Sequence, residues 1–73
     1  MQPNSKIVQI EGTVLEALGG LLFKVKLDAD DREVLGHLGG KMKLYRIRVI
    51  PGDRVIVEMT PYDTARGRIV RRL

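Results

Sequence analysis

Side chains that could carry out covalent chemistry are scarce in this chain. Its 73 residues include one histidine, His37, and no cysteine. A nucleophile needs a base within hydrogen-bond reach, and that base is usually histidine. A lone His37 at the end of an expected strand does not supply such a pair, so we predict that the protein is not an enzyme. The same scarcity argues against a transition-metal site, and the lack of cysteine excludes a disulfide framework.

Two short motifs fall short of a cofactor site. Asp28, Asp30 and Asp31 lack the glycine and the terminal glutamate that a calcium loop needs at fixed spacing, so we interpret them as turn residues. The run Gly39-Gly40-Lys41 lacks the Gly-x4-Gly-Lys-Ser/Thr spacing of a nucleotide phosphate loop. The sequence therefore predicts no metal and no cofactor.

Binding is better supported, because charge is unevenly distributed along the chain. Residues 37–73 carry nine Lys or Arg against three acids, whereas residues 1–36 carry four against six. A domain this small cannot hide its charges, so part of its surface must present a positive field that attracts polyanions. Nucleic acid is the leading partner, and a set of merely solvated charges is the alternative. Apart from Arg54, the basic residues of this half form two clusters: Lys41, Lys43, Arg46 and Arg48, then Arg66, Arg68, Arg71 and Arg72.

The aromatic residues distinguish between modes of RNA binding. Phe23, Tyr45 and Tyr62 are the only three in the chain. Phe23 falls on the apolar side of an expected strand, which leaves Tyr45 and Tyr62, each in an expected loop, to stack on bases. Two rings do not make the extended platform of a sequence-tolerant single-strand binder. We therefore expect a folded RNA, recognised through its backbone charge with one or two stacked or flipped bases.

The elements that must position these residues are short strands. Alternation of apolar and polar residues predicts strands at about 6–17, 21–27, 33–38, 54–59 and 68–73. Gly12 marks a bulge or sharp bend in the first strand, and Leu18-Gly19-Gly20 is a hairpin turn signal. In the second strand, one face is apolar and consists of Leu21, Phe23, Val25 and Leu27.

The remaining segments connect these strands. Residues 39–45 break the alternation and are expected to form a loop with one or two helical turns, and residues 60–67 are expected to form a loop. Residues 1–5 are polar and are expected to be a flexible N-terminus, which leaves residues 6–73 as a single domain. No apolar stretch approaches the ~20 residues that span a bilayer, and the N-terminus lacks the apolar region of a signal peptide. We therefore expect a cytoplasmic protein.

Five strands with a short helical insertion between the third and fourth are typical of an all-β oligonucleotide-binding (OB) barrel. An SH3-like barrel, which also packs five strands into this length, is the chief rival, and the insertion favours the OB fold. Loops between strands border the binding surface of an OB barrel, so we expect the two basic clusters to converge there.

Several longer motifs resemble one family. They are the segments 37–43 (HLGGKMK), 47–49 (IRV), 52–58 (GDRVIVE), 60–63 (TPYD) and 66–69 (RGRI), with 11–18 and 23–25 upstream. In order and spacing, these motifs resemble bacterial translation initiation factor one over nearly the whole chain from about residue 7.

The resemblance implies an OB barrel that binds the small ribosomal subunit at its decoding A site, between ribosomal RNA elements and a neighbouring ribosomal protein. It implies displacement of decoding-centre bases, a block on premature binding of tRNA, and cooperation with initiation factors two and three in selecting initiator tRNA. The protein would act by occupancy and would be a monomer off the ribosome. Positions matching the family's RNA-facing residues are Lys41, Lys43, Arg48, Arg66, Arg68 and Arg72, and further candidates are His37, Tyr45, Arg46, Tyr62 and Arg71.

The chain also departs from the family pattern. Gly39 stands where the family usually has Ser, and Gly19-Gly20 where it usually has Pro-Asn. Tyr45 precedes Arg46, which shifts the aromatic ring by one residue, and Arg71 replaces an aromatic residue. The turn at residues 28–32 is about one residue longer. These changes add positive charge, and they leave a diverged paralogue as an alternative to the main factor.

Two other function classes remain open. The first is a general RNA-binding OB module, such as a cold-shock-like chaperone, against which the lack of an aromatic-rich strand motif counts. The second is a small barrel that mainly binds protein and carries incidental positive charge.

Overall fold

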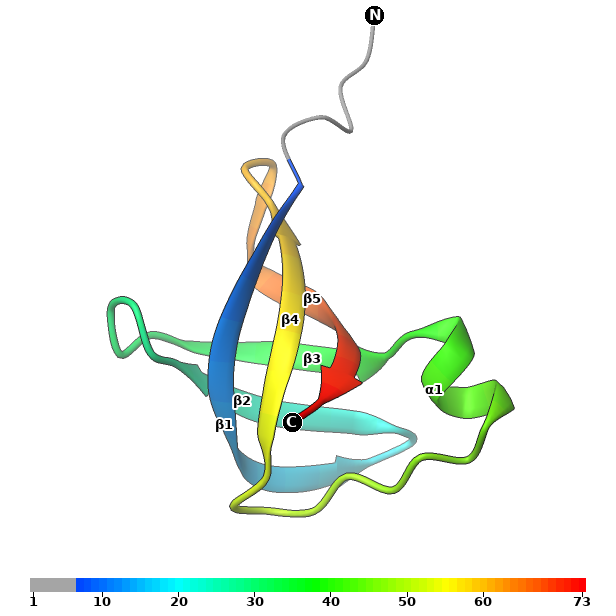
Figure 1. Ribbon diagram of the computed structural model, residues 1–73. Coiled ribbons are helices and arrows are strands. Elements are labelled where there is room, and N and C mark those ends of the chain that lie inside the picture. The colour runs from blue at the N-terminus through cyan, green and yellow to red at the C-terminus, as the bar shows by residue number, and fades with distance from the viewer. Residues whose placement is uncertain (1–6) are drawn as a thin grey trace, which may run out of the picture.

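The computed structural model describes residues 7–73. These residues form a closed five-stranded barrel with one short helix. The segment at 1–5, expected to be flexible, lies outside them. The elements are β1 (Val8–Gly19), β2 (Leu22–Leu27), β3 (Glu33–Leu38), α1 (Gly40–Leu44), β4 (Arg54–Thr60) and β5 (Asp63–Arg72). The strand order around the barrel is β1-β2-β3-β5-β4 (Figure 1). Among the strands of the described residues, only β3 and β5 pair in parallel. The predicted OB-type barrel, with its helical turns between the third and fourth strands, is confirmed.

The barrel closes because the long strand β1 pairs with two neighbours. Its first half pairs with β4 and its second half with β2, and both pairings include Gly12. A Cβ at Gly12 would lie 2.7 Å from the Lys26 carbonyl oxygen and 2.8 Å from Val25 Cγ1, so only glycine fits between these strands. The bulge expected at Gly12 lies further along, because the register shifts between Val14 and Glu16 and again before Gly19.

The core is built from aliphatic side chains with one phenylalanine and two methionines. In β4, Val55, Val57 and Met59 alternate inward and are almost completely buried, as the sequence pattern predicts. Burying one such side chain is worth roughly 1.5–3 kcal/mol. The core residues are Val14, Phe23, Val25, Leu27, Val34, Leu38, Met42, Val49, Val55, Val57, Met59 and Ile69. No helix within residues 7–73 is long and apolar enough to cross a membrane.

The loop expected at residues 60–67 is wrong, because β5 begins at Asp63 directly after a turn at Pro61 and Tyr62. The Asp63 carboxylate accepts hydrogen bonds from the backbone N–H groups of Ala65 and Arg66, each at 3.1 Å. The β4–β5 hairpin projects beyond the rest of the barrel (Figure 1). A strand that extends into solvent needs no alternation of apolar and polar residues. Its residue pattern therefore indicates a loop.

The expected place of Leu21 on the inner face of the second strand is also wrong. Gly20 and Leu21 form the β1–β2 turn with φ angles of 61° and 62°, the pair of positive values that a tight hairpin turn requires. The strand therefore starts at Leu22, and Leu21 is 49% exposed. Phe23, Val25 and Leu27 are buried as predicted.

Candidate nucleic-acid interface

The cations of residues 7–73 fall into two classes according to their partners. Five lie within 4.0 Å of a carboxylate: Lys24, Lys26, Arg32, Arg54 and Arg68. Seven have no acidic partner in that part of the chain: Lys41, Lys43, Arg46, Arg48, Arg66, Arg71 and Arg72. All seven lie in α1, in the loop that follows it, or in β5. The positive field of the barrel therefore comes mainly from these three segments.

Arg54 shows how another part of the surface is neutralised. Its Nη1 donates to Asp28 Oδ1 and to Thr13 Oγ1, each at 3.0 Å. Its Nη2 donates to the second oxygen of Asp28 and to Glu11 Oε2 at 3.3 Å. The hydrogen bond from Arg54 lowers the pKa of Asp28. Arg54 belongs to the basic half of the sequence, but its charge is balanced within the barrel.

Helix α1 presents Lys41 and Lys43 on either side of a buried anchor. Met42, between them, is 2% exposed and packs in the core. Successive residues of a helix point about 100° apart, so the two lysines diverge from Met42 into solvent. Because this segment is helical and not extended, its charges spread around it instead of pointing to one side.

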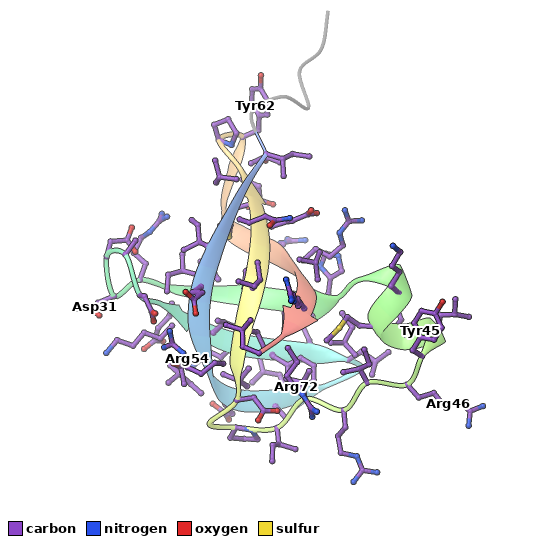
Figure 2. The ribbon with its side chains drawn as sticks, in the orientation of Figure 1. Asp31, Tyr45, Arg46, Arg54, Tyr62 and Arg72 are labelled. Carbon is purple, nitrogen blue, oxygen red and sulfur yellow. The ribbon has the colours of Figure 1, made fainter. Side chains whose placement is uncertain are left out.

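The helix ends in a motif that directs Arg46 outward. The N–H of Ile47 donates to the Met42 carbonyl at 2.9 Å, and the N–H of Arg46 donates to the Lys43 carbonyl at 3.1 Å. These two bonds define a Schellman motif, whose central residue has a positive φ and is usually glycine. Here that residue is Arg46, with φ 53°. Its side chain points away from the barrel, next to Tyr45 at the helix end (Figure 2).

Arg48 and Arg72 bring the loop and the end of β5 together. Arg72 Nη1 donates to the backbone carbonyl of Arg48 at 2.8 Å, across 24 positions of sequence. A guanidinium has five N–H donors, so Arg72 keeps others for a ligand. The two basic clusters thus meet at this point.

Strand β5 carries Arg66 and Arg68 on its outer face, with buried Gly67 between them. A Cβ at Gly67 would collide with Val57 and would lie 2.7 Å from Met59 Sδ and 2.9 Å from the Glu58 carbonyl oxygen. Glycine therefore allows β5 to lie close to β4, which fixes the position of both arginines. On the other side of β5, the parallel register places His37 of β3 opposite Arg68.

Two grooves cross this surface. The first, of about 700 Å³, is lined by His37 and Arg66 together with apolar residues such as Leu35. The second, of about 560 Å³, is lined by Lys41 and Arg71 and runs between α1 and β5. Arg68 and Glu58 line both grooves. Lys41 from the first cluster and Arg68 and Arg71 from the second therefore share one groove, whereas Lys43, Arg46 and Arg48 line neither.

Tyr45 and Tyr62 are 69% and 79% exposed but are not brought together. Tyr45 ends α1, and Tyr62 lies at the tip of the β4–β5 hairpin, at separate extremities of the molecule (Figure 2). Each ring could stack on one base, and the two cannot form a common platform.

Glu58 is the residue of this surface that sequence reasoning missed. Its Oε1 accepts a 2.7 Å hydrogen bond from Arg68 Nη2, and this bond is the main cause of its lowered pKa. The alternation in β4 could have placed Glu58 on the outer face, but its position opposite Arg68 depends on the strand register. Within residues 7–73, no group of three His, Asp or Glu side chains is arranged to hold a metal ion.

The chain matches the family described as Translation initiation factor 1A / IF-1 over residues 1–73. Among solved structures it is similar to translation initiation factor one from the Wolbachia endosymbiont strain TRS of Brugia malayi. The two are 42% identical with a TM-score of 0.78, over 99% of this chain and 84% of that chain.

Two further structures share the barrel. YjeQ from Thermotoga maritima is 27% identical with a TM-score of 0.75, over 90% of this chain and 23% of that one. Eukaryotic translation initiation factor 5A from Methanococcus jannaschii is 16% identical with a TM-score of 0.65, over 92% of this chain and 44% of that one, which shows likeness of fold alone. By the match over its whole length and its identity to a bacterial initiation factor one, this chain belongs to the IF-1 family of translation initiation factors.

Proposed function

We propose that this protein occupies the decoding A site of the small ribosomal subunit in the bacterial cytoplasm. There it blocks premature binding of tRNA and cooperates with initiation factors two and three in selecting initiator tRNA. It acts as a monomer, through occupancy, without catalysis or a cofactor. One observation carries the proposal: in a chain of this family, the cations of residues 7–73 without acidic partners gather on α1, on the loop after it and on β5.

Ribosomal RNA is the proposed ligand of these segments. Side chains of Lys41, Lys43, Arg48, Arg66 and Arg72 would neutralise phosphates and release counterions, and Arg68 joins them at the junction of the two grooves. If about five phosphates are neutralised, affinity falls by roughly two to three powers of ten between 50 and 200 mM salt. His37, Tyr45, Arg46, Tyr62 and Arg71 are proposed as further RNA contacts, and a neighbouring ribosomal protein would complete the site.

Co-sedimentation of labelled protein with purified small subunits tests the proposal. We expect binding that a ligand of the A site abolishes and that weakens steeply with salt. Equal binding to unstructured RNA would instead indicate a general RNA-binding module, and binding that does not depend on RNA would indicate a protein partner. Either result would overturn the A-site proposal.

Matched charge removals locate the contact on the barrel. Lys41→Ala should weaken subunit binding and make the dependence of log affinity on log salt shallower by about 1. The thermal midpoint should change little. Lys26→Ala removes the same charge from a lysine that lies 3.8 Å from Asp31, so we expect little change in binding. Equal losses in the two variants would mean that only net charge matters. A collapse of folding in Lys41→Ala would make that residue structural.

A further inference from the structure

Glu58 places a negative charge in the middle of the basic surface. The register sets Gln9 of β1 opposite Glu58 of β4, Glu58 opposite Arg68 of β5, and Arg68 opposite His37 of β3. These four residues form one row across the outside of the barrel. Glu58 and Arg68 line both grooves, so the pair stands where the two grooves meet.

The carboxylate of Glu58 is held from two sides. Oε1 accepts the 2.7 Å hydrogen bond from Arg68 Nη2, and Oε2 accepts a 3.3 Å hydrogen bond from Gln9 Nε2. The side chain of Glu58 is only 21% exposed, whereas that of Arg68 is 52% exposed. Hydrogen bonds between charged groups are the stronger kind, and the bond from Arg68 is the main cause of the lowered pKa of Glu58.

Arg68 is the only one of the six family-matching cations with an acidic partner in residues 7–73. Glu58 takes one N–H of Arg68 Nη2, and a phosphate that binds the other donors of this guanidinium lies beside the Glu58 carboxylate. Every polyanion that binds Arg68 meets this opposition, because like charges close together repel each other.

We propose that Glu58 competes with RNA phosphate for Arg68 and so sets how strongly Arg68 contributes to RNA affinity at the junction of the two grooves. The inference rests on the proposed function in so far as the ligand is RNA. It makes Glu58 an internal competitor, whose charge lowers the affinity of this surface for RNA.

The variant Glu58→Gln keeps the size of the side chain and removes its charge. We expect it to bind a poly(U) oligonucleotide more tightly than the wild type, with a salt slope steeper by about 0.7, the value for one more phosphate on a single strand. That increment corresponds to about 2.5-fold more loss of affinity between 50 and 200 mM salt. Affinity for purified small subunits should rise as well, because the same carboxylate opposes any phosphate at Arg68.

Glu16→Gln is the matched control. It makes the same chemical change at a glutamate 3.8 Å from Lys24 and outside both grooves. It should leave the poly(U) slope unchanged. In an Arg68→Ala background, Glu58→Gln should add nothing to that slope, because there is no guanidinium to release.

Two results would overturn the role of Glu58: equal effects of Glu58→Gln and Glu16→Gln on poly(U), or a gain in slope that survives Arg68→Ala. If Glu58→Gln lowers the thermal midpoint strongly, Glu58→Thr provides an uncharged residue with high strand propensity for the same comparison. A wild-type protein that binds no small subunits would refute the proposed function itself. A wild-type protein that binds them, with Glu58→Gln matching Glu16→Gln, would refute only the role of Glu58.

Discussion

Replacing Gly67 with alanine should destabilise the barrel, because β5 lies too close to β4 to admit a Cβ. The added methyl group would collide with Val57 and would lie 2.7 Å from Met59 Sδ and 2.9 Å from the backbone oxygen of Glu58. Overpacking of a core typically costs about 1–3 kcal/mol. A backbone oxygen cannot rotate away as a side chain can, so we expect a cost of about 2–3 kcal/mol, in the upper part of that range. For a domain of this size that corresponds to a thermal midpoint lower by roughly 10–20 °C.

The same substitution at Gly40 is the control. Gly40 is the first residue of α1, and a Cβ there would have no atom within 4 Å. Alanine loses less conformational entropy than glycine in a helix, so Gly40→Ala should raise stability by up to about 0.5–1 kcal/mol. Thermal and urea unfolding of both variants measure the difference. The reasoning is refuted if Gly67→Ala unfolds at the wild-type midpoint, or if both substitutions shift the midpoint in the same direction.

Three further substitutions or conditions test the elements that position the basic surface. Met42→Ala removes the buried anchor of α1 and should cost about 2–5 kcal/mol in urea unfolding; a cost well below that range would mean that the helix is not held by its packing. Arg46→Gly relieves the positive φ at the helix end, so it should be about 1 kcal/mol more stable than Arg46→Ala, while both variants lose the same charge and the same RNA affinity. Because the hydrogen bond from Arg68 lowers the pKa of Glu58 below its ordinary 4.5, the pair's contribution to stability is fully present above that ordinary value and is lost as the pH falls through the lowered one. The difference in thermal midpoint between wild type and Glu58→Gln should therefore close in acid, and a difference that stays constant would contradict this linkage.

Alternation in the sequence predicts the strands that bury one side. Val55, Val57 and Met59 in β4 are buried as expected, because each strand of a barrel has one face in the core and one face exposed to solvent. The same rule fails at Leu21 and at Asp63. Leu21 is apolar and continues the pattern of the second strand, but the positive φ of the hairpin turn takes it out of that strand. Asp63 begins a strand that projects into solvent, where no periodic signal arises.

The sequence also does not predict which carboxylate pairs with which cation. The two basic clusters are visible in the order of residues, and six of the seven unpartnered cations of residues 7–73 are neighbours or near neighbours in that order: Lys41, Lys43, Arg46, Arg48, Arg71 and Arg72. The pairings of Arg54 with Asp28 and of Arg68 with Glu58 join residues that are 26 and 10 positions apart. They depend on register and on the path of a turn, which a list of residue types does not contain.

Arg54 and Arg68 are both paired with carboxylates, but the surroundings of the two pairs differ. Arg54 donates to a hydroxyl and two carboxylates that come from β1 and from the turn after β2, so a ligand would have to break several bonds to take it. Arg68 donates to one carboxylate, from the strand beside it, at the edge of two open grooves. A single competing phosphate can replace that one partner. The number of partners around each guanidinium therefore separates the two ion pairs. The pair at Arg54 links elements of the barrel, whereas the pair at Arg68 can exchange with a ligand.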